Sequence, residues 1–167
     1  MPRVFISIGS NLGDRVLNCK KALGEVSAFA RILRVSSAYE TEPVGSEDQP
    51  PFINCAAEIE TALHPLDLLD RLHEVEKRLG RIRDETWGPR TIDIDIIFYD
   101  DLVIDTEELK IPHVSAHARR FVLEPVCEID PWLVHPGFGV RVYELLDKLE
   151  DTKKVEKVGN PSTLFPQ

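Results

Sequence analysis

Two acidic residues one position apart, Asp93 and Asp95, are the strongest candidates for chemistry in this sequence. They lie in an otherwise apolar run from Ile92 to Tyr99, whose β-branched and aromatic content is typical of a strand. Side chains alternate along a strand and successive residues rise about 3.3 Å, so the two carboxylates share one face with Cα atoms about 6.5 to 7 Å apart. The spacing therefore predicts that both carboxylates converge on one site.

Ionised carboxylates among isoleucines are costly to desolvate unless cations neutralise them. Carboxylates are hard oxygen ligands that suit Mg²⁺, which completes its octahedron with water and substrate phosphate oxygens. The pair thus indicates a Mg²⁺ site that works together with a nucleotide. On the Asp-x-Asp pattern alone, a solvated edge of an ordinary half-buried strand is an equally good interpretation.

The loop before this strand concentrates positive charge. Residues 77–91 contain five cations and two anions, a net charge of +3 in a chain of net charge −9. Guanidinium groups bind phosphate oxygens bidentately, and Trp87 adds an aromatic plane to the loop. We expect Arg81, Arg83 and Arg90 to form an anion site, and we expect Arg78, which lies on the preceding helix, to pair with surface acids.

The elements that must position these side chains follow a simple order. Hydrophobic periodicity and turn residues predict strands at 1–9, 32–37, 52–61 and 92–99, and helices ending near 30 and spanning 65–79. The order strand-helix-strand-strand-helix-strand fits an α+β, ferredoxin-like sandwich with four antiparallel strands and two helices on one face. Residues 100–150 are C-terminal additions with a helix at 142–149, and 151–167 is expected to be a loose tail.

Composition limits the possible functions. With 167 residues and 43% hydrophobic content, we expect a single domain spanning residues 1–167. The net charge of −9 argues against broad binding to nucleic acid or to an anionic membrane. Three widely spaced cysteines argue against a disulfide framework, and the short apolar N-terminus argues against a signal peptide, so we expect a cytoplasmic protein. The P-loop pattern is absent from the sequence.

Several segments together resemble the 6-hydroxymethyl-7,8-dihydropterin pyrophosphokinase family of folate biosynthesis. The resemblance runs from about residue 4 to residue 135, and the segments that carry it are 8–13, 48–54, 81–83, 87–97, 112–113 and 119–121. It implies a cytoplasmic kinase-type transferase that moves the terminal diphosphate of ATP to the hydroxymethyl oxygen of 6-hydroxymethyl-7,8-dihydropterin and releases AMP. It also implies two Mg²⁺ ions held between Asp93, Asp95 and the triphosphate. We expect a monomer whose partners are these two small molecules.

The resemblance also assigns roles to individual residues. The phosphate contacts it implies are Arg81, Arg83, Arg90, His113 and Arg119, with Trp87 helping to close the loop. Further ATP contacts are implied at His73, at Glu76 and at the backbone around Ile96. The pterin contacts it implies are Phe52 and Phe121 on the two ring faces, Asn54 at the ring edge, and the backbone of Thr41 and Val44. The chain departs from the best-known members at Val114, Glu108 and Lys110.

Two loops and three alternatives complete these expectations. We expect residues 43–51 and 81–91 to close over the substrates and exclude water. A ferredoxin-like RNA-binding module is a rival from another class, although carboxylates on the fourth strand would repel phosphate. A two-metal phosphodiesterase is a rival enzyme that would not need a flat-ring pocket. The spacing of His113 and His117 suits a transition metal, but no acidic third ligand is evident.

Overall fold

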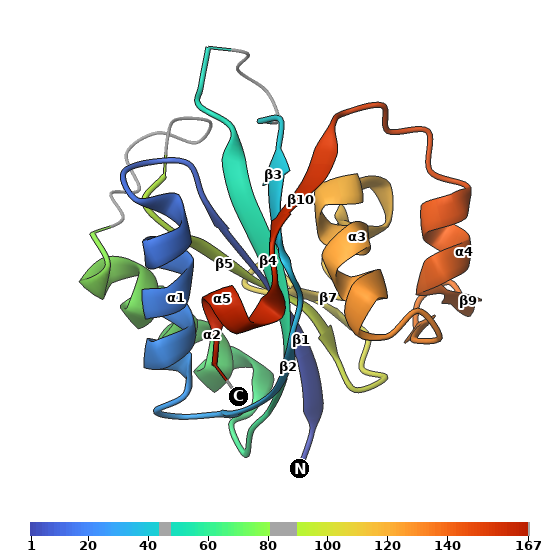
Figure 1. The fold of residues 1–167 in the computed structure, drawn as a ribbon. Coiled ribbons are helices and arrows are strands. Elements are labelled where there is room, and N and C mark those ends of the chain that lie inside the picture. Colours follow the sequence, from blue (N-terminus) through green and yellow to red (C-terminus); the bar gives the residue numbers. More distant parts are fainter. Residues whose placement is uncertain (44–47, 81–89, 167) are drawn as a thin grey trace.

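The central sheet joins strands from both ends of the chain (Figure 1). The computed structural model describes residues 1–43, 48–80 and 90–166. The strands of this sheet are β1 (Arg3–Ser10), β2 (Arg31–Val35), β3 (Ala38–Thr41), β4 (Phe52–Glu60), β5 (Asp93–Tyr99) and β10 (Val155–Gly159). Their order is β10-β3-β4-β1-β5, with β2 also paired to β4, and every pairing is antiparallel. The chain therefore has the ferredoxin-like core that the element order predicts.

Helices cover both faces of the sheet (Figure 1). On one face lie α1 (Arg15–Val26) and α2 (Pro65–Arg78), as predicted, together with the short α5 (Pro161–Leu164). On the opposite face lie α3 (Arg120–Ile129) and α4 (Val142–Asp147), which belong to the C-terminal additions. The remaining short elements are β6 (Ile104–Asp105), β7 (Lys110–Ile111), η1 (Ala116–Ala118), β8 (Val134–His135) and β9 (Val140–Arg141).

Strand β1 explains how one sheet supports two cores. Its side chains alternate, so Ile6 and Ile8 join the core under α1 and α2, whereas Phe5 joins the core under α3. Ser7 and Gly9 continue the α3 side of the strand with small residues. Helix α3 therefore covers the half of this face around Phe5. In the other half, the small residues Ser7 and Gly9 leave open space above the sheet.

The second helix has the boundaries that its sequence signals predict. Pro65 stands at the first helical position, where its fixed φ favours a helix start, and the basic residues Lys77 and Arg78 occupy the last turn. Gly80 follows with φ +89°, a conformation that glycine adopts without steric cost. This helix carries His73 and Glu76 toward β5.

Two predicted segments differ from the structure. The strand expected at 32–37 is shorter than predicted: β2 ends at Val35, Ser36 and Ser37 belong to no strand, and β3 begins at Ala38. The prediction of a loose tail at 151–167 is wrong for residues 151–166, which the structure describes. Strand β10 pairs with β3, and Leu164 of α5 is only 1% exposed in the core beside α1. Tail residues therefore complete the sheet edge and the core.

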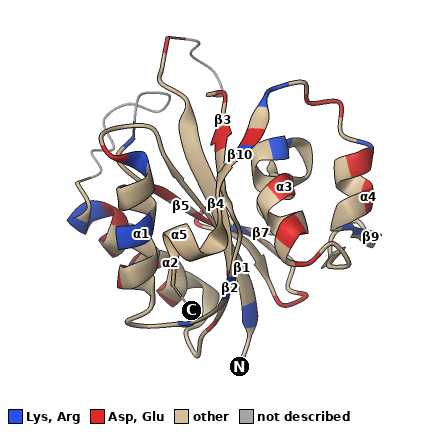
Figure 2. Cartoon of the chain, in the orientation of Figure 1, with Lys and Arg blue, Asp and Glu red and all other residues tan. Residues whose placement is uncertain are grey.

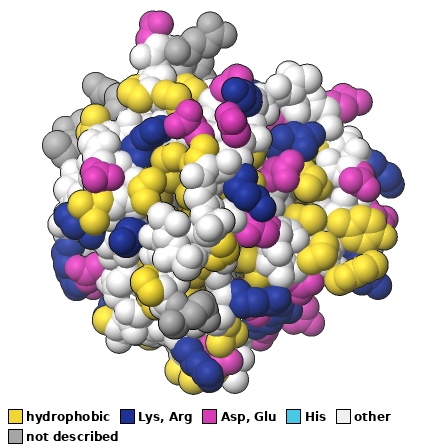
Figure 3. All heavy atoms as spheres, viewed as in Figure 1, with side chains coloured by type: hydrophobic (Ala, Val, Ile, Leu, Met, Phe, Trp, Pro, Cys, Tyr) yellow, Lys and Arg dark blue, Asp and Glu magenta, His cyan; other side chains and the backbone are white. Residues whose placement is uncertain are grey.

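Charge is distributed over the whole molecule. Acidic and basic residues both occur on the helices of each layer (Figure 2), and the face in Figure 3 shows blue and magenta side chains interspersed. Among the described residues, no helix combines the length and the apolar character needed to cross a membrane.

Candidate functional site

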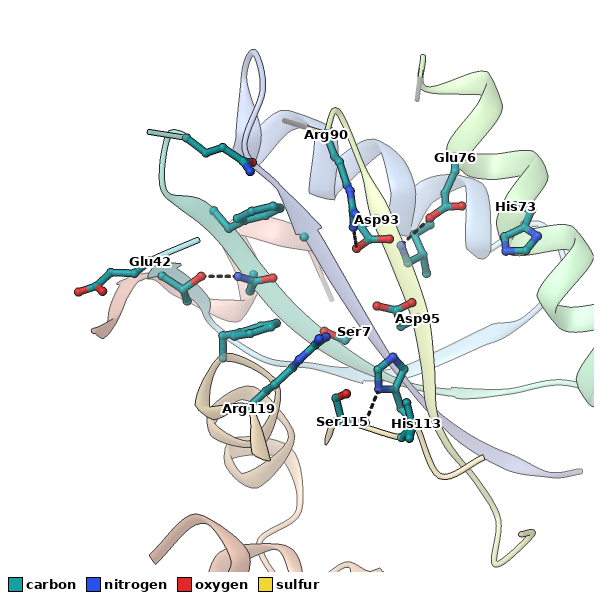
Figure 4. A pocket seen from close by; sticks show the side chains of 18 of the residues that line it. Ser7, Glu42, His73, Glu76, Arg90, Asp93, Asp95, His113, Ser115 and Arg119 are labelled. Carbon is teal, nitrogen blue, oxygen red and sulfur yellow. Dashed lines mark hydrogen bonds and ion pairs between the residues drawn. The ribbon is translucent and has the colours of Figure 1, made fainter. Parts of the chain in front are cut away.

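A cavity of about 390 Å³ lies where β1, β4 and β5 meet the segment that leads into α3. Its floor is the uncovered half of the sheet, and Figure 4 shows side chains from several elements turned toward it. The cavity combines carboxylates, cationic groups and aromatic rings. A ligand with both a charged and a flat part would therefore match its lining.

The two aspartates of β5 are placed as their spacing predicts. Asp93 pairs with Gly9 and Asp95 pairs with Ser7 across the β1 ladder, and both aspartates line the cavity. Directly paired residues of antiparallel strands share a face, so each carboxylate stands beside a small neighbour. The small side chains leave space above the sheet for ions or water around the carboxylates.

Cationic groups surround this carboxylate pair. Arg90 forms an ion pair with Asp93, with 2.9 Å between Nη1 and Oδ2, and both side chains are about one fifth exposed (Figure 4). Arg119 lines the same cavity from the start of α3, with its guanidinium 5.6 Å from the ring centre of Phe121. The cavity therefore offers positive charge on two sides, as a polyphosphate needs.

His113 is held in one orientation at this end of the cavity. Its backbone N–H donates to the carbonyl of Ile97, and its Nδ1 accepts a hydrogen bond of 3.2 Å from the N–H of Ser115. Burial and the nearby Arg119 lower the pKa of His113, while Asp93 acts in the opposite direction. A neutral imidazole whose Nδ1 accepts must carry its proton on Nε2, so His113 can donate a hydrogen bond from Nε2.

The opposite end of the cavity is suited to a flat ring. Phe52 and Asn54 come from β4, Thr41 from β3 and Phe121 from α3. Asn54 is 4% exposed, and its Nδ2 donates to Thr41 Oγ1 over 2.6 Å. The amide is thereby fixed beside two aromatic side chains, which is an arrangement that can read the polar edge of a heterocycle.

Helix α2 closes the cavity at the outer edge of β5. Glu76 is 1% exposed, and its carboxylate accepts a hydrogen bond of 2.9 Å from the N–H of Ile94. His73 lines the cavity one turn earlier on the same helix. The predicted ATP contacts His73 and Glu76 therefore lie at the site. Ile96 faces the core under α1 and α2, so its side chain does not line the cavity.

Asn11 is a residue that sequence reasoning did not assign to the site. It is 1% exposed, and its Nδ2 donates to Gln49 Oε1 and to the carbonyl of Pro50. Its Oδ1 accepts a 2.7 Å hydrogen bond from the N–H of Arg90, and its own N–H donates to the Arg90 carbonyl. One buried amide thus joins both loops that border the cavity. A sequence signal existed in the turn at 9–13, but it did not reveal these partners.

The other predicted residues are placed as follows. Val44, Arg81, Arg83 and Trp87 lie outside the described residues, as do residues 44–47 and 81–89 of the two segments expected to close over the substrates. Arg78 forms an ion pair with Glu25, which confirms the prediction that it pairs with an acidic residue at the surface.

Positions that differ from the family pattern lie mostly outside the cavity. Val114 lines it, whereas Lys110 forms a surface pair with Asp105, and Glu108 is exposed. His117 packs on the ring of Phe138, with 4.9 Å between ring centres.

The donor set of the cavity fits Mg²⁺ better than a transition metal. Within residues 1–43, 48–80 and 90–166, no three or more His, Cys, Asp or Glu side chains are grouped as a metal-binding set. A pair of carboxylates is sufficient for Mg²⁺, which keeps water and substrate oxygens in its other positions. Zinc sites usually draw three or four ligands from the protein.

Comparison with known proteins gives consistent matches. The family model "7,8-dihydro-6-hydroxymethylpterin-pyrophosphokinase (HPPK)" matches residues 5–131. A 2-amino-4-hydroxy-6-hydroxymethyldihydropteridine pyrophosphokinase of Haemophilus influenzae is 39% identical over 158 residues, which cover 93% of this chain and 98% of the relative. The folic acid synthesis protein fol1 of Schizosaccharomyces pombe is 42% identical over 147 residues, which are 87% of this chain.

Some relatives are much longer than this chain. The chain spans 20% of the length of the Schizosaccharomyces pombe protein. A crystal structure of Plasmodium falciparum HPPK-DHPS superposes with a TM-score of 0.73 at 18% identity, covering 88% of this chain and 43% of that one. At this identity the superposition supports the fold, and the matched sequence relatives support the family.

Proposed function

The chain belongs to the 7,8-dihydro-6-hydroxymethylpterin-pyrophosphokinase family, and we propose that it catalyses the reaction that names the family. In this reaction the terminal diphosphate of ATP is transferred to the hydroxymethyl group of 6-hydroxymethyl-7,8-dihydropterin, and AMP is released. The product enters folate biosynthesis. The chain is thus a transferase of the diphosphokinase class.

One observation carries this proposal. A single cavity holds the carboxylates Asp93 and Asp95 with the cations Arg90 and Arg119, and it holds the ring-binding group around Asn54 at its other end. A phosphodiesterase or an RNA-binding sheet has no need for a cavity that combines a buried, hydrogen-bonded amide with two aromatic side chains. A diphosphate transfer to a pterin needs both the group of carboxylates and cations and the ring-binding group.

Different residues of the cavity are proposed to bind the metal ions and the phosphates. Asp93 and Asp95 would hold two Mg²⁺ ions, which supply charge neutralisation at the triphosphate and lower the pKa of the attacking hydroxyl. Arg90, Arg119 and the Nε2–H of His113 would bind phosphate oxygens and stabilise the charge that develops on them. Arg81 and Arg83 are proposed to add to this contact, with Trp87 closing the loop.

The organic parts of the substrates are proposed to lie further along the same cavity. Phe52 and Phe121 would stack on the two faces of the pterin, while Asn54 and the backbone of Thr41 and Val44 bind its edge. For the nucleotide, His73, Glu76 and the backbone around Ile96 are proposed to hold the adenosine. Positioning the hydroxymethyl oxygen in line with the β-phosphorus supplies much of the rate, since phosphoryl transfer requires little proton abstraction.

We further propose that residues 1–167 act as a single pyrophosphokinase domain, working as a monomer in the cytoplasm. Its ligands are ATP and the dihydropterin. The cysteines Cys19, Cys55 and Cys127 are free thiols, which supports a reducing compartment.

The direct test measures AMP release from ATP in the presence of 6-hydroxymethyl-7,8-dihydropterin and Mg²⁺. Asp95→Asn keeps the size of the side chain and removes the charge, so we expect kcat to fall at least about 100-fold, more than typical losses from outer-shell changes at metal sites. Asp101→Asn, an exposed acid in the turn after β5, is the control and should leave kcat unchanged.

Two results would contradict this function. One is AMP formation at the normal rate by Asp95→Asn under saturating Mg²⁺ and ATP. The other is the absence of any pterin-dependent AMP release by the unsubstituted protein. Hydrolysis of a phosphodiester without the pterin would instead favour the phosphodiesterase.

A further inference from the structure

Glu128, in the last turn of α3, connects that helix to β3 by a compact set of hydrogen bonds. Its carboxylate accepts from the N–H of Ser37 at 3.0 and 3.1 Å and from Ser37 Oγ at 2.9 Å. It also accepts from the hydroxyl of Tyr39 at 2.6 Å. Ser37 and Tyr39 are 2% and 5% exposed. Burial and this hydrogen bond raise the pKa of Tyr39, so its hydroxyl stays protonated as a donor.

The strand that Glu128 holds is part of the ring-binding end of the cavity. In the β3–β4 ladder Tyr39 pairs with Asn54 and Thr41 pairs with Phe52, so these four residues share the face toward α3. Thr41 accepts the hydrogen bond that fixes Asn54. A shift of β3 toward or away from α3 would therefore move the edge-reading amide.

The helix that Glu128 terminates carries the other side of the same pocket. Phe121 lies in the first turn of α3, seven residues before Glu128, so both side chains project from one face of the helix. The other polar contacts at the end of α3 lead to different strands. Arg34 of β2 donates to the carbonyl of Ile129, and Arg3 of β1 pairs with Asp130.

We propose, on the basis of the function proposed above, that Glu128 is a positioning residue for the dihydropterin. By joining the end of α3 to β3, it sets the separation between Phe121 on the helix and the side formed by Phe52 and Asn54 on the sheet. A flat ring gains its stacking energy only when both aromatic neighbours lie at van der Waals distance. Glu128 touches neither substrate, and its effect is confined to the pterin end.

The test is isothermal calorimetry with a dihydropterin analogue and, separately, with Mg²⁺ and a non-hydrolysable ATP analogue. Glu128→Gln keeps the volume but replaces one carboxylate oxygen by an N–H₂ group, which cannot accept from the Ser37 N–H. One of the two contacts to that N–H is therefore lost, and the negative charge that strengthens the remaining hydrogen bonds is removed. We expect the Kd of the pterin analogue to rise about tenfold, which corresponds to about 1.4 kcal/mol. The Kd of the nucleotide should not change, and a thermal melt establishes that the variant is folded.

A second variant and a matched control keep the inference testable. Tyr39→Phe removes the hydroxyl alone and should weaken pterin binding in the same direction. The double variant should lose less binding free energy for the pterin than the sum of the two single variants, because both changes act on the same group of hydrogen bonds around Glu128. Glu124→Gln, on the same helix and paired at the surface with Arg120, should bind both ligands normally.

The possible failures are distinguishable. Unchanged pterin affinity in folded Glu128→Gln and Tyr39→Phe would overturn the positioning role while leaving the proposed function intact. An equal loss of affinity for both ligands would also overturn it, because it indicates a general structural effect. Absence of pterin binding by the unsubstituted protein would overturn the proposed function itself.

Discussion

At the scale of single residues, Gly9 has a role that depends on its missing side chain. It lies on β1 between Asn54 of β4 and Asp93 of β5, at the floor of the cavity. A Cβ atom at this position would stand 2.5 Å from Asn54 Oδ1, closer than two such atoms can approach. The glycine thus allows the amide of Asn54 to lie flat over the strand.

We expect Gly9→Ala to push the Asn54 amide away from Thr41 and to weaken pterin binding about tenfold or more, the effect of losing one well-placed hydrogen bond of about 1.4 kcal/mol. Calorimetry with a pterin analogue measures this change. Gly24→Ala is the control, because a Cβ there meets nothing within 4 Å. On the exposed side of α1 this change should raise the free energy of unfolding by about 0.5 to 1 kcal/mol. Normal pterin affinity in Gly9→Ala would contradict the close approach.

Residue types alone identified part of the site. The spacing of Asp93 and Asp95 was sufficient to place both on one face of a strand, because strand geometry is local. The role of Asn11 was not predictable in the same way. Its partners Gln49 and Arg90 lie 38 and 79 residues along the chain, and only the fold brings them together.

At the scale of elements, the edge strand β10 stabilises β3 by pairing with it. It pairs with β3 from Val155 to Gly159, and α5 follows at once and inserts Leu164 beside α1. Strand β3 is therefore paired on both sides, by β4 and by β10. This support matters for function because β3 carries Thr41 at the ring-binding end.

We expect Leu164→Ala to lower the free energy of unfolding by about 2 kcal/mol or more, the usual cost of removing a buried leucine side chain. Urea denaturation measures the change. Val158→Ala on β10 is the control, since Val158 is 50% exposed and its loss should cost about 0.5 kcal/mol. Equal effects of the two substitutions would show that α5 is not anchored through Leu164.

At the scale of the whole molecule, the buried residue His135 should make the stability of the fold depend on pH. It is 4% exposed, and its Nδ1 accepts hydrogen bonds from the N–H groups of Gly137 and Phe138 at 3.1 and 3.2 Å. Its ring stacks on Phe138 and contacts Phe98. Burial, together with the nearby His117, lowers the pKa of His135 in the folded state.

A lowered folded-state pKa means that the unfolded chain binds the proton more readily. The stabilising contribution of His135 is therefore complete above its unfolded pKa of about 6.5, and it is lost as the pH falls from there through the folded pKa. We expect unfolding midpoints to decrease over this range, and to decrease less in His135→Gln. His64→Gln, at an exposed position before α2, should retain the pH dependence of the unsubstituted protein. Parallel pH profiles for both variants would exclude His135 as the cause.

The sequence by itself determined the ferredoxin-like order of the core elements, the ends of α2 and the shared face of Asp93 and Asp95. These features follow from periodicity, capping residues and strand geometry, which act over a few neighbouring residues. The tertiary structure alone decided that α3 covers half of a sheet face, that β10 completes the edge, and that Glu128 and Asn11 join distant segments. Such contacts depend on how whole elements pack, and an amide or a carboxylate in a sequence does not specify which distant partner it will meet.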